Sequence, residues 1–74
     1  MNRNEIIKDY IKFCNDTKRN ANDRKNRKIY AKNLALYMLS FGQISIDKFE
    51  NTMKEIENIL KYNTLTIATL TKKA

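Results

Sequence analysis

The chain contains no proline, no histidine, no tryptophan, one glycine and one cysteine in 74 residues. Short strands are joined by turns that depend on glycine and proline, so this composition argues against an all-β fold. A structural zinc site takes about four cysteine or histidine ligands, and a disulfide takes two cysteines, so both are excluded within one chain. The length allows one domain at most, residues 1–74, with a small core of its own.

The same composition also lacks most of the residues that enzymes use for catalysis. Without histidine, acid–base chemistry needs paired carboxylates in a cleft, whereas Glu50, Glu55 and Glu57 are interspersed with lysines as helix-surface residues are. A single glycine cannot build a glycine-rich phosphate loop. Cys14 has no histidine to activate it, so we expect it to be a small core residue. The sequence therefore predicts no enzyme, no cofactor, no metal and no small-molecule substrate.

A membrane segment is not expected either. The longest apolar run, residues 34–39, is far shorter than the roughly 20 residues that span a bilayer. The first residues lack the apolar segment of a signal peptide, and one unpaired cysteine fits a reducing compartment, so we expect a cytoplasmic protein. Ten asparagines among many lysines and isoleucines are typical of AT-rich coding, an association that favours a phage or mobile-element origin.

Apolar residues recur at helical spacing in three stretches. They predict an all-α domain with helices over about 4–17, 22–41 and 46–62. Between the second and third stretches, Gly42 suits the left-handed position that ends a helix, and Ser45 suits the N-cap of the next one. The predicted fold is therefore a small three-helix domain built on a helical hairpin.

Residues 63–74 are ambiguous in sequence. The alternating spacing of the third helix continues through Asn63 and Ile67, which would extend that helix. Residues 64–71, however, alternate partly between threonine and apolar side chains and are rich in β-branched residues, a pattern typical of strands. The alternatives are an extended helix, a strand, a flexible tail, or a segment that a partner orders.

The second and third helices carry an apolar surplus. On the third, large apolar residues recur at alternating steps of three and four, the pattern of a helix packed on another helix. Asn63 continues this pattern as a polar residue of the kind that fixes register and partner number. We therefore expect a homodimer or a bound protein partner. The predicted seam consists of Tyr37, Phe41, Phe49, Met53, Ile56, Leu60, Asn63 and Ile67.

Seven of the fifteen lysines and arginines lie between residues 18 and 32, where one aspartate opposes them, so this segment carries +6 of the formal +7. A compact positive field favours a polyanionic partner. Arg24, Lys28 and Lys32 fall four residues apart on one helix face, which can straddle a phosphate backbone. Tyr30 stands beside them as a candidate base-stacking or interface residue. The predicted binding residues are Lys18, Arg19, Arg24, Lys25, Arg27, Lys28, Lys32 and Tyr30.

Three interpretations of this basic segment stay open in sequence: a solvated face, a nucleic-acid interface, or a contact for an acidic protein surface. A helix-turn-helix repressor would carry its cations on the helix after the turn, whereas here they lie at the start of the helix before it. The first hypothesis is a non-catalytic accessory protein associated with nucleic acid. The alternative is a phage or mobile-element protein-binding module, an inhibitor, scaffold or adaptor that acts through the apolar seam.

Overall fold

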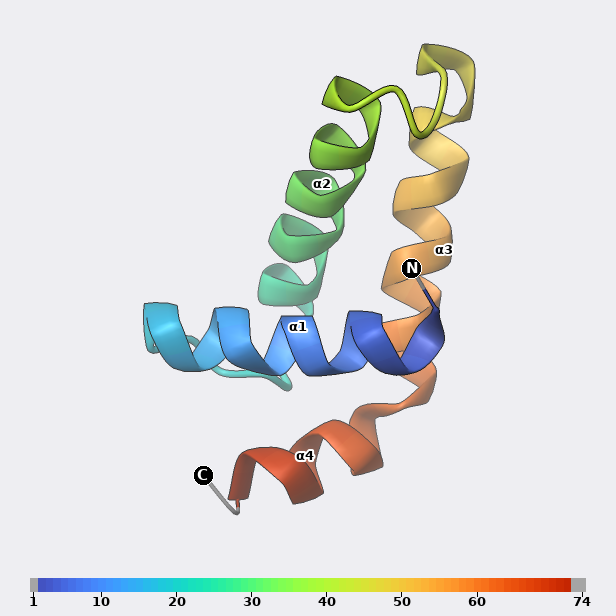
Figure 1. Cartoon of the computed structure of the whole chain (residues 1–74). Helices are drawn as coiled ribbons and strands as arrows, with labels where there is room; N and C mark the ends of the chain where they lie inside the picture. The colour runs from blue at the N-terminus through green and yellow to red at the C-terminus, as the bar shows by residue number, and fades with distance from the viewer. Residues whose placement is uncertain (1, 73–74) are drawn as a thin grey trace.

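The computed structural model describes residues 2–72, which fold as helices joined by short loops (Figure 1). No strand occurs within this range, so the predicted all-α class is confirmed. No helix in the same range has both the length and the apolar character needed to cross a bilayer. The helical elements are α1 (Arg3–Thr17), α2 (Arg24–Ser40), the 3₁₀ turn η1 (Ile46–Lys48), α3 (Phe49–Tyr62) and α4 (Thr64–Lys72).

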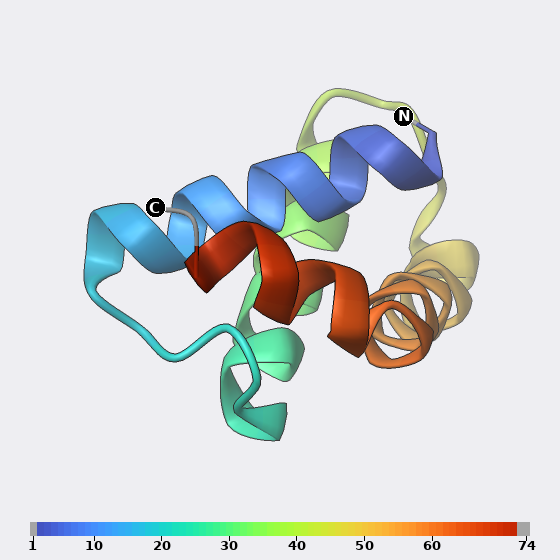
Figure 2. The same ribbon diagram turned by 90° about the horizontal axis from the view of Figure 1, so that it is seen from below.

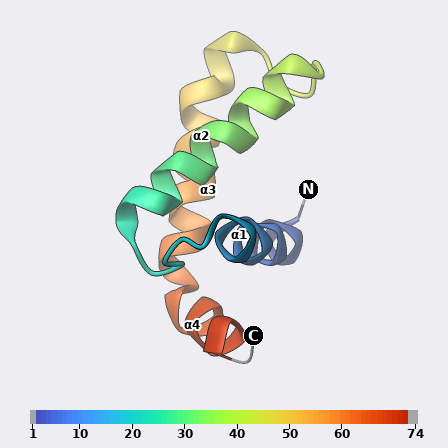
Figure 3. The same ribbon diagram turned by 90° about the vertical axis from the view of Figure 1, so that its left-hand side faces the viewer.

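Helices α2 and α3 run antiparallel as a hairpin and make the most extensive contact in the molecule. Helix α1 crosses one face of this hairpin, as Figure 3 shows by looking along α1. Helix α4 lies beside α1 and runs in the same direction, at the end of the hairpin opposite its turn (Figure 2). The half of the hairpin next to the turn therefore projects beyond α1 and α4.

Local caps explain where the helices begin. Asn2 and Glu5 form a capping box at the start of α1, in which Asn2 Oδ1 accepts from the Glu5 amide at 2.9 Å and Glu5 Oε2 accepts from the Asn2 amide at 3.3 Å. Asp23 caps α2, because its side chain accepts a hydrogen bond from the amide of Lys25 at 2.9 Å. The predicted helix bounds agree with the observed ones to within two residues when η1 is counted with α3.

The turn between α2 and α3 follows its prediction. Gly42 has a φ of 71°, in the left-handed region that favours glycine, just after α2 ends. Ser45 occupies the N-cap position of η1, although its side chain makes no capping hydrogen bond. The helical hairpin expected from this short sequence signal is therefore confirmed.

The core is built from all the long helices. Tyr10 and Cys14 of α1, Leu60 of α3 and Ile67 of α4 are the largest side chains with almost no exposed surface, and α2 packs Ala31 against them. Burial raises the pKa of the Cys14 thiol, as expected for a cysteine packed as a small apolar residue. One continuous apolar cluster thus holds the hairpin, α1 and α4 together.

The segment that the sequence left open forms α4. Ile67 is 1% exposed, so α4 is packed into the core rather than left as a flexible tail or a strand. Asn63 separates α3 from α4, and its Nδ2 donates to the carbonyl of Ile59 at 2.6 Å. The third helix therefore does not continue unbroken through Asn63. Residues 73 and 74, the end of the predicted tail, lie outside the described part of the chain.

Candidate nucleic-acid interface

Four basic side chains form an exposed ridge along the first half of α2. Arg24, Lys28 and Lys32 lie four residues apart on one face of the helix, and Lys25 lies beside them. All four side chains are exposed, and within residues 2–72 none of them makes a hydrogen bond or an ion pair. We call these four residues the basic ridge.

Two residues of the basic ridge, Arg24 and Lys25, lie in the first turn of α2, where a cation is unfavourable. The N-terminal end of a helix holds a partial positive charge, so cations in the first turn are disfavoured by roughly 0.3–1 kcal/mol each. The first turn of α2 contains no acidic residue. The carboxylate of Asp23, at the N-cap, is the negative charge that partly offsets these cations. Arg24 and Lys25 therefore gain nothing from the helix dipole, and all four side chains of the ridge are exposed to an external anion.

Two of the predicted binding residues instead hold the loop between α1 and α2. Arg19 Nη1 donates to Asn26 Oδ1 at 3.3 Å, and the Arg19 guanidinium carbon lies 5.6 Å from the centre of the Phe13 ring. Arg27 Nη1 donates to the carbonyl of Asn22 at 3.0 Å. Their charges add to the positive field, but both side chains are also part of the fold.

The same loop is fixed by a buried amide. Asn26 is buried, and its Nδ2 donates to the carbonyl of Asn20 at 2.9 Å. Lys18 is exposed at the end of α1, where its φ of 55° places it in the left-handed region. The basic segment is thus an ordered loop followed by an ordered helix.

The structure brings α3 to the basic ridge. The polar hollow between the two helices has a volume of about 390 Å³ and is lined by Arg24, Arg27, Lys28, Glu57, Asn58 and Lys61. The sequence prediction missed Lys61, because a lysine four residues after Glu57 has the spacing of an ordinary helix ion pair. The signal that could have identified it is the hairpin itself, since antiparallel helices place the end of α3 beside the start of α2.

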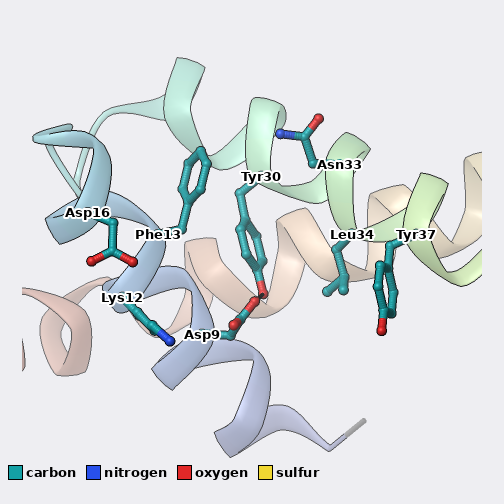
Figure 4. Close-up of a pocket in the computed structure, with 8 residues that line it drawn as sticks. All are labelled: Asp9, Lys12, Phe13, Asp16, Tyr30, Asn33, Leu34 and Tyr37. Atoms are coloured by element: carbon teal, nitrogen blue, oxygen red, sulfur yellow. Dashed lines mark hydrogen bonds between the residues drawn. The ribbon is translucent and has the colours of Figure 1, made fainter.

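Tyr30 is not a surface residue, and the prediction that it offers a ring for base stacking is wrong. It is 4% exposed, and its ring packs between those of Tyr10 and Phe13, with centroid distances of 5.2 Å and 5.6 Å. Its hydroxyl donates to Asp9 Oδ2 at 2.7 Å (Figure 4). Burial and this hydrogen bond raise the pKa of the Tyr30 phenol. Tyr30 therefore joins α2 to α1 inside the core.

A groove between α1 and α2 has the opposite character to the polar hollow (Figure 4). Its volume is about 490 Å³, and its lining includes the rings of Phe13 and Tyr37, the carboxylates of Asp9 and Asp16 and the ammonium group of Lys12. The two carboxylates outnumber the single lysine, so the groove has no excess of positive charge to attract a phosphate group. The groove is therefore not an extension of the basic ridge.

The predicted seam is divided by the structure. Ile56, Leu60 and Ile67 are buried in the core of their own chain, so their assignment to a contact with another chain is wrong. Phe49, Met53 and Asn63 are half-buried. Tyr37 and Phe41 remain accessible, at 56% and 67% exposed, with ring centroids 4.6 Å apart. Leu36 and Ile46 are exposed nearby in the sequence, and the four residues Leu36, Tyr37, Phe41 and Ile46 are called the apolar tip.

Over residues 2–72 there is no group of three acidic, cysteine or histidine side chains that could hold a metal ion. No family model, no curated protein and no solved structure matches this chain. The candidate interface is therefore defined by its own geometry and charge, with the basic ridge of α2 at its centre and the polar hollow along one side.

Proposed function

We propose that this chain is a non-catalytic accessory protein that binds nucleic acid through contacts between the basic ridge and the phosphate backbone. The observation that carries the proposal is the set of four exposed cations on one stretch of α2, none of them paired within residues 2–72. From Arg24 to Lys32 the helix rises about 12 Å, at about 1.5 Å per residue. Duplex DNA presents one charge per roughly 1.7 Å of its axis, so a ridge of this length faces several phosphates at once.

The charge distribution supports the same partner. The formal net charge is +7, and the sequence between residues 18 and 32 holds most of it. Such a field raises the association rate with a polyanion and gives binding that depends on salt rather than on base sequence. The groove between α1 and α2 shares no lining residue with the basic ridge, so its two carboxylates are not part of the ridge.

Binding of a short DNA duplex and of a single-stranded RNA, followed by fluorescence anisotropy, tests the proposal. Four phosphate contacts give a slope of log K against log salt of about −3 to −4, a loss of roughly 100-fold between about 50 mM and 200 mM salt. Replacing Arg24→Glu together with Lys28→Glu should reduce this slope by at least half. Position 24 lies in the first turn of α2, where a glutamate suits the helix dipole, and Lys28 is exposed, so this variant is expected to fold.

The matched control is Lys8→Glu together with Lys12→Glu, which makes the same change in net charge at two exposed positions of α1. The control should keep most of the affinity, because α1 is not the contact surface. Equal losses in the two variants, or no binding by the unaltered chain at low salt, would contradict the proposal.

A second candidate function is self-association through the apolar tip, with a second copy of this chain as the occupant. The observation that favours it is the exposure of four apolar side chains close in sequence to the hairpin turn, of which the rings of Tyr37 and Phe41 are in contact. A chain of this size has a small core, and burial against an identical chain is a common way to complete it. Sedimentation equilibrium tests it: the unaltered chain should dimerise, and Tyr37→Ser with Phe41→Ser should abolish the dimer. A monomer at millimolar concentration would exclude it.

A further inference from the structure

We propose that the polar hollow between α2 and α3 is a phosphate site, which holds one phosphate group between the two helices. This inference rests on the proposed function and deepens it, because it names a specific ligand group and adds residues of α3 to the contact. The basic ridge alone presents a row of charges on one helix. The hollow adds a second wall, from residues 57–61, that no spacing along α2 reveals.

The cations of the hollow converge from both helices. Arg24 and Lys28 of the basic ridge line one side, and Lys61 of α3 lines the other. Arg27, half-buried, lines the hollow as well and uses Nη1 for the Asn22 carbonyl. A guanidinium carries five N–H donors, so this single hydrogen bond leaves donors for a ligand. Arginine forks match the geometry of phosphate oxygens and can bind them in pairs.

The net positive charge of the hollow favours an anionic ligand. Its lining holds four cations and one carboxylate, so an excess of positive charge faces a space large enough for a phosphate group and some water. Asn58 adds an amide that can donate to a phosphate oxygen. No carboxylate forms an ion pair with the basic ridge within the described residues, and the four cations of the hollow are offset only in part by Glu57 in its lining and Asp23 at the cap of α2.

Glu57 gives the site a distinctive property. Its half-buried carboxylate lies in the lining of a hollow that would otherwise be wholly basic or neutral. A carboxylate beside a bound phosphate repels it, so Glu57 weakens the binding of a phosphate. Glu57→Gln should therefore strengthen binding, whereas loss of a cation from the same lining should weaken it.

Titration of the full chain with inorganic phosphate, at constant ionic strength with chloride, tests the site by chemical shifts of the backbone amides. Shifts should concentrate in residues 24–28 and 57–61. Lys61→Gln should weaken phosphate binding by about two- to fivefold, a range typical of exposed charge pairs. Lys54→Gln makes the same change at another exposed position of α3 and should have no effect. Equal effects of the two lysine variants would overturn the inference.

Two glutamate variants of α3 give an independent test of the phosphate site. Glu57→Gln should strengthen phosphate binding by a similar factor, and Glu55→Gln, at an exposed position of the same helix, should leave it unchanged. Titration with acetate distinguishes a phosphate site from a general anion site. Acetate binding as strong as phosphate binding, or no strengthening by Glu57→Gln, would also overturn the inference.

A duplex and a single-stranded oligonucleotide separate this inference from the proposed function. If oligonucleotide binding depends on Arg24 and Lys28 while Lys61→Gln behaves like Lys54→Gln, the phosphate site is wrong and the proposed function stands. If inorganic phosphate binds in a manner sensitive to Lys61 but neither oligonucleotide binds, the proposed function is wrong. The site is then one for a free phosphate rather than for a nucleic-acid backbone.

Discussion

The Tyr30 phenol on α2 donates a hydrogen bond to the Asp9 carboxylate on α1, with 2.7 Å between Tyr30 Oη and Asp9 Oδ2. Tyr30 is buried while Asp9 lies at the surface, so the bond links the core to the edge of the groove between the two helices (Figure 4). It joins residues 21 positions apart and fixes α1 across the helix that carries the basic ridge.

Loss of this bond should destabilise the chain. Tyr30→Phe removes the donor and is expected to lower the free energy of unfolding by about 1.5–3 kcal/mol, the range for a hydrogen bond to a charged group. Urea unfolding followed by circular dichroism measures it, with the exposed Tyr37→Phe as a control near zero. In a double-mutant cycle with Asp9→Ala, the two losses should not add, because either change removes the same contact. Fully additive losses would show that the bond contributes nothing.

Two buried tyrosines predict a loss of stability in alkali. Burial raises the pKa of Tyr10 and of Tyr30 above the ordinary value of 10.0, so both phenols stay protonated in the folded chain where the unfolded chain ionises. Above about pH 10 the unfolded state therefore binds fewer protons than the folded state. The contribution of the two tyrosines to the free energy of unfolding is complete below about pH 10. Above that pH it falls by up to about 1.4 kcal/mol per pH unit for each tyrosine. Unfolding free energies measured from about pH 9 to pH 11 should show this decline, and Tyr30→Phe should make it shallower. A flat profile in the unaltered chain would contradict the prediction.

Asp23 should affect stability and ligand binding in opposite directions. Its side chain caps α2 by accepting from the Lys25 amide, and its charge also lies beside the basic ridge. Asp23→Ala should cost about 1 kcal/mol of unfolding free energy through loss of the cap, whereas Asp23→Asn should keep the cap and change stability little. Both variants should bind an oligonucleotide more tightly, because both remove a negative charge next to the ridge. Weaker binding by Asp23→Asn would indicate that the ridge is not the contact surface.

Helix α4 should be an integral part of the fold. Ile67 is fully buried while Leu65, two residues earlier on the same helix, is 85% exposed. Ile67→Ala should cost about 2–4 kcal/mol, and Leu65→Ala less than about 0.5 kcal/mol. Thermal unfolding followed by circular dichroism compares the two variants directly. A domain of this size has a total stability of only about 4–11 kcal/mol, so the Ile67 change should be easily seen. Similar losses in both variants would place α4 outside the cooperative core.

The hairpin could be predicted from sequence because its signal is local. Gly42 supplies the left-handed residue after α2, and the apolar spacing on both sides is helical. The structure of residues 64–72 could not be predicted from sequence, because their intrinsic secondary-structure preference disagrees with their packing in the folded chain. β-branched residues favour strands, yet Thr69 directs its hydroxyl to the Leu65 carbonyl at 2.9 Å within the helix, and burial of Ile67 outweighs the local preference.

In the candidate site too, only the features set by local spacing along one helix could be predicted from the sequence. Spacing of four residues placed Arg24, Lys28 and Lys32 on one face, and the structure keeps them there. Tyr30 was assigned to the surface from its basic neighbours in sequence, although its position four residues before the buried Leu34 places it on the inner face of α2. Lys61 required knowledge of which helix packs beside the ridge, which is a tertiary fact.

The predicted seam failed for a related reason. Alternating steps of three and four on α3 indicate that another helix packs against it, but they do not indicate whether that helix belongs to the same chain. Ile56 and Leu60 meet α1 and α2 of their own chain, so the pattern is satisfied internally. Of the predicted seam, Tyr37 and Phe41 stay exposed, at the end of α2 next to the turn.

Asn26 has a consequence for the thermodynamics of ligand capture. Its buried amide bonds the Asn20 carbonyl and accepts from Arg19, so the backbone leading into α2 is already immobilised when the chain folds. An anion that arrives at this end of α2 does not have to freeze a mobile loop, and the associated loss of conformational entropy falls on folding instead of on docking. Binding of a polyanion should then order the exposed side chains of the basic ridge without a rearrangement of this loop.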